Sequence, residues 1–205
     1  MSATAVLPGS VRDEASGRTL YNDEAAEPPL RYQRMSLAEY ERLPESELKV
    51  EWAHGWAIFM NAPTWDHSRI LINIGAVLKS ELPDLKVGAG PGLGLIDSRR
   101  IPDIAVFESP VPSDPSWIEQ APLIAVEILS PSTRRQDLVY KRAEYLDAGI
   151  AQYWIVDPQS RQITVLADAG GAWIEAAVVD EQHPATDVIV GTHGIVHLDL
   201  NDLFN

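Results

Sequence analysis

The chain of 205 residues contains no cysteine. This absence excludes a disulfide framework, a thiolate zinc site and a thiol nucleophile. The sequence also lacks an apolar run of the ~20 residues that a membrane-spanning helix needs. The N-terminal residues have no apolar core of the kind found in signal peptides. We therefore expect a protein of the reducing cytoplasm that has no membrane partner.

Basic residues are scarce as well. Lys and Arg together number 16 against 30 Asp and Glu, which gives a formal net charge of −14. Such a charge disfavours non-specific binding to nucleic acid, because the phosphate backbone is itself negative. Any nucleic-acid contact would therefore have to come from a local cluster of basic residues.

The composition predicts one domain with an N-terminal extension. Residues 1–34 are rich in Ala, Glu, Pro, Ser and Gly and show no apolar period, so we expect a flexible N-terminal arm. Residues 35–205 have ordinary hydrophobic content for a globular chain and are expected to form a single α/β domain.

Local signals place the elements of this domain. Ser36 and Glu39 have the spacing of a capping box, and His54-Gly55 predicts a tight turn between two strands. Thr64 or Asp66 can cap a helix that Pro83 ends. We further expect strands at 104–107, 123–129 and 152–156, a helix at 134–148, and C-terminal strands at 161–167, 172–179 and 195–198.

Glu127 is the most informative residue. It interrupts the apolar run LIAVEIL, which otherwise predicts a buried strand. A carboxylate there costs several kcal/mol unless it is paired, protonated or bound to a metal. Asp103 opens the preceding apolar strand, and two such carboxylates suit a hard cation. With Lys141 on the following helix, these residues could hold Mg²⁺ and cleave a phosphodiester.

Basic residues gather around this pair in the sequence. Six of the twelve that follow the arm lie close to the acids or on the next helix. They predict a cationic rim that would suit a phosphate substrate. These six are Arg99, Arg100, Arg134, Arg135, Lys141 and Arg142.

Several motifs occur in a fixed order along the chain. They are KVEWAHGW at 49–56, DHSR at 66–69, IPDIAVF at 101–107, VEILSPS at 126–132, DLVYKRAEY at 137–145 and YWIVDP at 153–158. From about residue 34 to residue 167 the chain resembles the Uma-two family of restriction endonucleases, in the PD-(D/E)XK nuclease superfamily.

This resemblance implies a fold and a set of site residues. The fold would be a restriction-endonuclease-like α/β core, with a central mixed β-sheet flanked by helices and a C-terminal antiparallel extension. Asp103 and Glu127 match the two acids of the superfamily. The usual lysine, two residues after the glutamate, is Leu129 here, and Lys141 on the next helix takes its place.

The resemblance adds further residues to the site. Glu51 matches an upstream acid that completes the metal shell, although without this resemblance a solvated strand carboxylate is the better interpretation. His67 matches a histidine typical of the family, and its position at a helix N-terminus is equally consistent with local packing. Tyr145 would contact the site from the Lys141 helix. The expected metal ligands are Asp103, Glu127, Glu51 and the carbonyl of Ile128.

The expected activity is Mg²⁺- or Mn²⁺-dependent hydrolysis of a phosphodiester, with DNA as the partner and 5′-phosphate and 3′-hydroxyl ends as products. A homodimer would suit duplex cutting, because two strands need two sites. Two alternatives remain open. One is a non-catalytic metal- or protein-binding module on a nuclease scaffold, which the acidic charge favours. The other is a phosphodiester hydrolase that acts on something other than duplex DNA.

Overall fold

A computed structural model describes residues 10–12, 19–21, 30–44, 48–108, 110–111 and 117–205. The chain divides into two compact units, Met1–Ala62 and Pro63–Asn205. Most of the expected arm, residues 1–34, lies outside the described residues, so its character and the boundary after residue 34 stay predictions.

The first unit is built around an antiparallel sheet in which β5 lies between β3 and β4. The turn between β4 and β5 has positive φ at both His54 and Gly55, as a two-residue hairpin of this hand requires. The predicted capping box is present, since Ser36 and Glu39 bond reciprocally at the start of α1. The elements are β1 (Ser10–Arg12), β2 (Thr19–Tyr21), β3 (Arg31–Arg34), α1 (Leu37–Tyr40), β4 (Val50–Ala53) and β5 (Trp56–Phe59).

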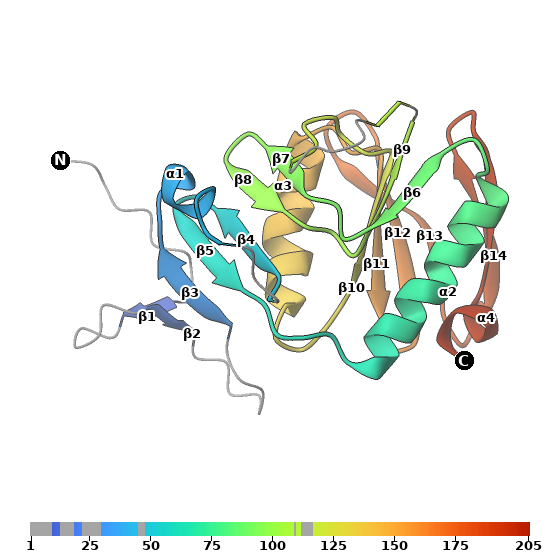
Figure 1. Ribbon diagram of the computed structural model, residues 1–205. Coiled ribbons are helices and arrows are strands. Elements are labelled where there is room, and N and C mark those ends of the chain that lie inside the picture. The colour runs from blue at the N-terminus through green and yellow to red at the C-terminus, as the bar shows by residue number, and fades with distance from the viewer. Residues whose placement is uncertain (1–9, 13–18, 22–29, 45–47, 109, 112–116) are drawn as a thin grey trace. The chain divides into compact units, whose positions relative to one another are not determined.

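The second unit contains a six-stranded sheet in the order β13-β12-β11-β10-β9-β6 (Figure 1). Strands β10 and β11 are parallel and all other neighbours are antiparallel. The predicted mixed sheet is therefore confirmed. The strands are β6 (Lys86–Ala89), β9 (Ile104–Phe107), β10 (Ile124–Ile128), β11 (Gln152–Asp157), β12 (Gln162–Asp168) and β13 (Trp173–Val179). Outside this sheet, β7 (Leu93–Leu95) and β8 (Ser98–Arg100) pair with each other as an antiparallel hairpin.

Helix α2 (Trp65–Glu81) covers one face of this sheet (Figure 1). Its N-terminus is capped by Thr64, whose side chain accepts a hydrogen bond from the backbone of His67. Its buried residues Ile70, Ile74 and Leu78 pack in one cluster with alternate residues of the sheet strands. The apolar residues on this face of the sheet are thus buried against α2.

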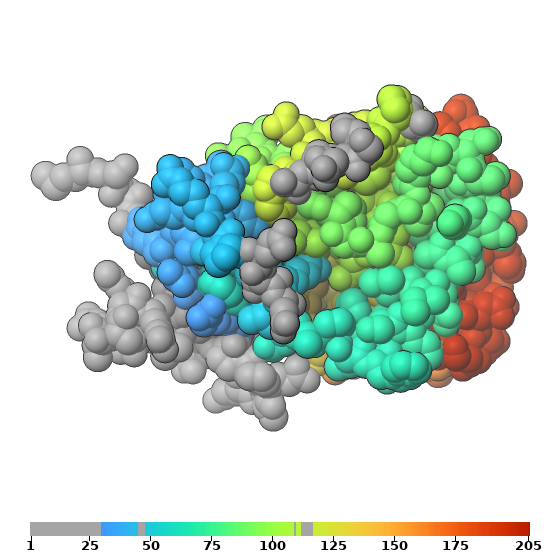
Figure 2. All heavy atoms as spheres, viewed as in Figure 1, coloured from blue at the N-terminus to red at the C-terminus, as the bar shows by residue number. Residues whose placement is uncertain are grey.

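The C-terminal segment packs on the same side as α2. It comprises β14 (Ala185–Val190), β15 (Gly194–Asp199) and α4 (Leu200–Phe204). Asn73 on α2 donates to the carbonyl of Leu203 at 3.2 Å, and the two segments adjoin at the surface (Figure 2). The sequence predicted only the 195–198 strand here. The strands expected at 161–167 and 172–179 are β12 and β13, which extend the central sheet.

The opposite face of the sheet is covered by the segment that carries Lys141. The sequence predicts a continuous α-helix over 134–148. The structure instead has a π-helical segment η1 (Gln136–Lys141) followed by α3 (Arg142–Asp147). In a π-helix the backbone hydrogen bonds run from i to i+5, which widens the turn and changes which side chains share a face.

None of the helices within the described ranges is long and apolar enough to cross a membrane.

Candidate active site

Asp103 and Glu127 lie at the same end of two neighbouring strands. The antiparallel register pairs Ile104 of β9 with Val126 of β10. One step further along, Asp103 stands opposite Glu127. Residues directly opposite in an antiparallel pair point to the same face. The two carboxylates predicted from separate apolar runs are therefore brought to one edge of the sheet, on the face that η1 and α3 cover.

Asp103 is held by two donors and is 9% exposed. Its Oδ2 accepts a hydrogen bond from the backbone N–H of Ile128 at 2.8 Å. The same oxygen lies 3.0 Å from Nε2 of His67, in the first turn of α2. Nδ1 of His67 is buried and has no hydrogen-bond partner within the described part of the chain. His67 thus contacts Asp103, and its role at the site stays a prediction.

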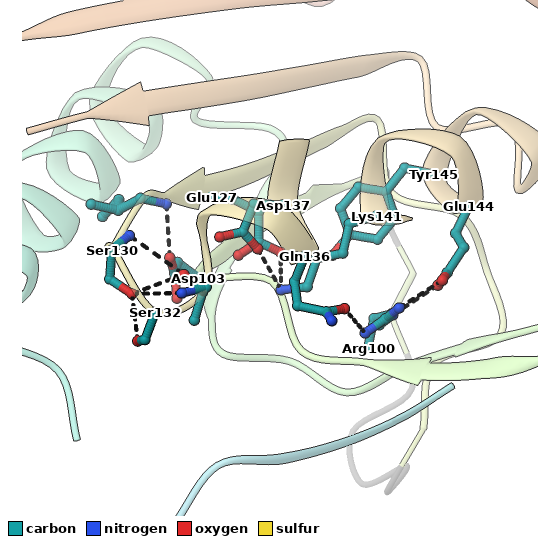
Figure 3. A network of polar contacts seen from close by, with 12 residues as sticks. Arg100, Asp103, Glu127, Ser130, Ser132, Gln136, Asp137, Lys141, Glu144 and Tyr145 are labelled. Atoms are coloured by element: carbon teal, nitrogen blue, oxygen red, sulfur yellow. Dashed lines mark hydrogen bonds and ion pairs between the residues drawn. The ribbon is translucent and has the colours of Figure 1, made fainter. Parts of the chain in front are cut away.

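Glu127 is 2% exposed and is contacted from η1 and α3 (Figure 3). Its Oε1 accepts hydrogen bonds from Nζ of Lys141 at 2.9 Å and from the hydroxyl of Tyr145 at 2.8 Å. Leu129, at the position where the superfamily usually has lysine, is buried in the apolar cluster on this face. Lys141 therefore reaches the glutamate from the helix.

Asp137 is part of the same cluster, and the sequence argument missed it. Its Oδ1 lies 3.1 Å from Nζ of Lys141, and both side chains are about 1% exposed. The sequence predicted that Leu138 shares a face with Lys141 and Tyr145, and Leu138 packs, half-buried, against the cluster that contains Tyr145. Asp137 lies on the buried side of η1 as well. The available signal was the four-residue spacing of Asp137, Lys141 and Tyr145.

This buried cluster has an excess of negative charge. Glu127 and Asp137 contribute two carboxylates against the single ammonium of Lys141, and burial leaves little water to screen them. Tyr153 donates its hydroxyl to the carbonyl oxygen of Asp137 at 2.9 Å. Burial, with the neighbouring charges of Asp137 and Glu127, raises the pKa of Tyr153 well above its usual value. The surroundings thus favour a proton or a cation.

The predicted cationic rim is smaller than the sequence suggested. Arg100 is 1% exposed and forms a two-pronged ion pair with Glu144 at 2.6 and 2.7 Å. Arg100 also reaches Gln136 at 3.4 Å, so it links η1 to α3 (Figure 3). Lys141 is buried as described above. Four arginines remain partly or largely exposed for a rim, and they are Arg99, Arg134, Arg135 and Arg142.

Glu51 belongs to the first unit. It lies on β4 and is fully buried. The expectation that it was a solvated strand carboxylate is therefore excluded, since no part of the residue is exposed. Its assignment to a metal shell stays a prediction.

The donor chemistry of the site suits a hard divalent cation. Asp103 and Glu127 supply carboxylate oxygens, and Ile128, whose carbonyl is a further expected ligand, is the last residue of β10. The described residues contain no group of three or more His, Asp or Glu arranged to hold a metal. Hard cations such as Mg²⁺ and Ca²⁺ prefer oxygen ligands.

Comparison with solved structures finds a crystal structure from Anabaena variabilis ATCC 29413, titled as a putative nuclease belonging to DUF820. The two chains are 26% identical and superpose with a TM-score of 0.71, over 83% of this chain and 97% of that chain. Comparison with curated proteins gives no match. The sequence profile of the Uma2 family, whose description is "Putative restriction endonuclease", matches residues 37–200. The chain therefore belongs to the Uma2 family, and its fold is that of the restriction-endonuclease-like nucleases.

Proposed function

We propose that the protein is a Mg²⁺- or Mn²⁺-dependent phosphodiester hydrolase that acts as a DNA endonuclease. The observation that carries the proposal is the convergence of Asp103 and Glu127 on one sheet edge, with Nζ of Lys141 2.9 Å from the glutamate. Membership of the Uma2 family and the likeness to a nuclease structure support the class of reaction.

The metal would be held by Asp103, Glu127 and the carbonyl of Ile128. When bound, the ion supplies Lewis acidity, which lowers the pKa of a coordinated water and neutralises charge on the phosphoryl oxygens. Glu127 and Asp137 are two buried carboxylates beside the ammonium of Lys141. A bound cation would compensate their excess negative charge.

Lys141 would act on the substrate side of Glu127. Its ammonium can donate a hydrogen bond to the attacking water or to a phosphate oxygen as negative charge develops there. Tyr145 donates to the same oxygen of Glu127 and so holds the carboxylate in place. His67 does the same for Asp103. The attack would leave a 5′-phosphate and a 3′-hydroxyl.

The substrate would approach over the exposed arginines. Arg134 and Arg135 precede η1 and Arg142 begins α3, so they surround the segment that carries Lys141. No Lys or Arg follows Arg161 in the chain. The C-terminal segment would therefore repel a polyanion and leave the arginine side as the favoured approach. Cleavage of both strands of a duplex would be achieved by a homodimer.

A nicking assay tests the proposal. Supercoiled plasmid is incubated with the protein in Mg²⁺, in Mn²⁺ and in a chelator, beside the Asp103→Ala and Glu127→Ala variants. The wild type should nick or linearise the plasmid only with metal, and both variants should be inactive. Wild-type cleavage by either variant would contradict the assignment.

The alternative of a non-catalytic metal- or protein-binding module is favoured by one observation, the net charge of −14. Calorimetry separates the two functions. Binding of Mg²⁺ or Mn²⁺ by the wild type, lost in Asp103→Ala, without cleavage of duplex DNA, single-stranded DNA or RNA would establish the module. Cleavage of RNA or single strands alone would show a phosphodiester hydrolase with another substrate.

A further inference from the structure

The proposed mechanism does not use Asp137. This carboxylate is about 1% exposed, and its Oδ1 is 3.1 Å from Nζ of Lys141. We propose that Asp137 is a positioning residue, which holds the ammonium of Lys141 against Glu127 in the place from which it acts on the reacting phosphate. The inference rests on the proposed function, because it assigns the way in which Lys141 is aimed.

A lysine side chain is flexible. Its ammonium sits at the end of four methylene groups, and one hydrogen bond leaves it free to rotate about its acceptor. Here Nζ faces two carboxylates on different elements. It donates a hydrogen bond to Glu127 Oε1 on β10 at 2.9 Å, and it forms an ion pair with Asp137 Oδ1 at 3.1 Å, four residues earlier on η1. The ion pair attracts Nζ from a second side, so the two contacts together restrict its position.

The backbone around Asp137 is itself fixed. Tyr153 on β11 donates its hydroxyl to the carbonyl oxygen of Asp137 at 2.9 Å, and both groups are buried. Asp137 and Lys141 are four residues apart on η1, and both side chains are buried on it. The sheet therefore positions the aspartate, and the aspartate positions the lysine. A π-helical segment replaces the regular i→i+4 hydrogen bonds of an α-helix. Such segments occur often at functional sites.

The charge balance indicates that this contact has a role beyond stability. Lys141 also has a carboxylate partner in Glu127. Burying a second carboxylate beside it carries a desolvation cost. A fixed position of the ammonium offsets this cost in function, since small displacements of a reacting group cost large factors in rate.

The test uses Asp137→Asn, with Asp147→Asn as the matched control. Asp147 is an exposed carboxylate at the end of α3, outside the site. For plasmid nicking in Mg²⁺, Asp137→Asn should lower kcat by roughly 10- to 100-fold with KM within about twofold of wild type. Mn²⁺ affinity measured by calorimetry should stay at the wild-type value. The control should match the wild type in all three quantities.

A second readout does not depend on activity. The chain has four lysines, Lys49, Lys79, Lys86 and Lys141, so their side-chain ¹⁵N ammonium resonances can be resolved by NMR, with Lys141→Arg identifying the signal of Lys141. A fixed, buried ammonium gives a sharp signal in the wild type and in Asp147→Asn. Asp137→Asn should broaden or shift that signal and leave the other three unchanged.

Each outcome has a definite meaning. An unchanged Lys141 resonance in Asp137→Asn overturns the positioning role, as does an unchanged kcat. Loss of Mn²⁺ affinity in that variant also overturns it, by making Asp137 a metal ligand. If the wild type cleaves no nucleic acid, the proposed function fails, while the altered Lys141 signal would still show that Asp137 fixes the ammonium.

Discussion

The backbone N–H of Ile128 donates a 2.8 Å hydrogen bond to Oδ2 of Asp103. Ile128 directly follows Glu127, so this bond ties one proposed metal ligand to the neighbour of the other. It gives Asp103 a structural task as well as the proposed catalytic one. Substitutions at Asp103 can separate the two tasks, because an amide keeps the acceptor and loses the charge.

Asp103→Asn should retain the fold and lose cleavage. The asparagine carbonyl can still accept from Ile128, whereas a neutral amide is a poor ligand for Mg²⁺. Asp103→Ala removes the acceptor too and should lower the free energy of unfolding by a further ~1–3 kcal/mol. Urea unfolding followed by circular dichroism, beside the plasmid assay, measures both effects. Mg²⁺-dependent cleavage by Asp103→Asn at the wild-type rate would contradict the metal assignment.

Replacing Lys141 by methionine should destabilise the protein strongly. The side chain keeps its length, but Glu127 and Asp137 then lack the buried ammonium that balances them. Removing one partner of a buried ion pair typically costs about 3–5 kcal/mol. Adding Glu127→Gln to Lys141→Met should recover part of this loss. Chemical denaturation of the two single variants and the double variant gives the coupling energy, and a value near zero would show that the pair is not coupled.

The strands that form the site were predictable from the sequence. Apolar runs bounded by Pro102 and Phe107, and by Leu123 and Leu129, place β9 and β10 to within a residue. Glu127 stood out because a carboxylate inside such a run needs a partner, and the structure supplies Lys141 and Tyr145. A local sequence pattern is sufficient here, because strand burial depends on residues close together in the chain.

The surroundings of Lys141 were less predictable. An apolar period of 3.6 residues cannot distinguish an α-helix from a helix with a π-helical segment. Asp137 was assigned to no site because its local sequence does not show that a charged residue will be buried. Arg100 looked like a rim residue because its partner, Glu144, is 44 positions away in the sequence. Strand β14 and helix α4 were also missed, since their buried residues pack in a cluster with α2, which is distant in the sequence.

The hydroxyl of Tyr153 gives the protein an alkaline-sensitive contact. Burial, then the charges of Asp137 and Glu127, raise its pKa in the folded state above the ordinary value near 10.0. The folded protein thus holds this proton more tightly than the unfolded chain. The stability that this group contributes is fully present below pH ~10 and is lost as the pH rises from there toward the folded-state pKa.

Tyr153→Phe should remove this dependence. Below pH ~9 the variant should be less stable by about 1 kcal/mol, because the hydrogen bond to the Asp137 carbonyl is lost. Above pH ~10 the difference from wild type should shrink, since only the wild type has a phenol to ionise. Free energies of unfolding in urea between pH 8 and pH 11 test this. A difference that stays constant across the range would refute the proposed role of the Tyr153 proton.

A divalent cation should stabilise the folded protein even if no substrate is cleaved. Binding to the folded state alone at 100 times Kd adds about 2.7 kcal/mol, which corresponds to a rise in Tm of roughly 5–10 °C for a domain of this size. Asp103→Asn and Glu127→Gln should abolish the rise. Asp202→Asn, on the surface of α4, should keep it. Calorimetric scans in Mg²⁺ and in a chelator measure the shift. An equal rise in all four proteins would mean that the ion binds the acidic surface in general and that the two carboxylates are not its site.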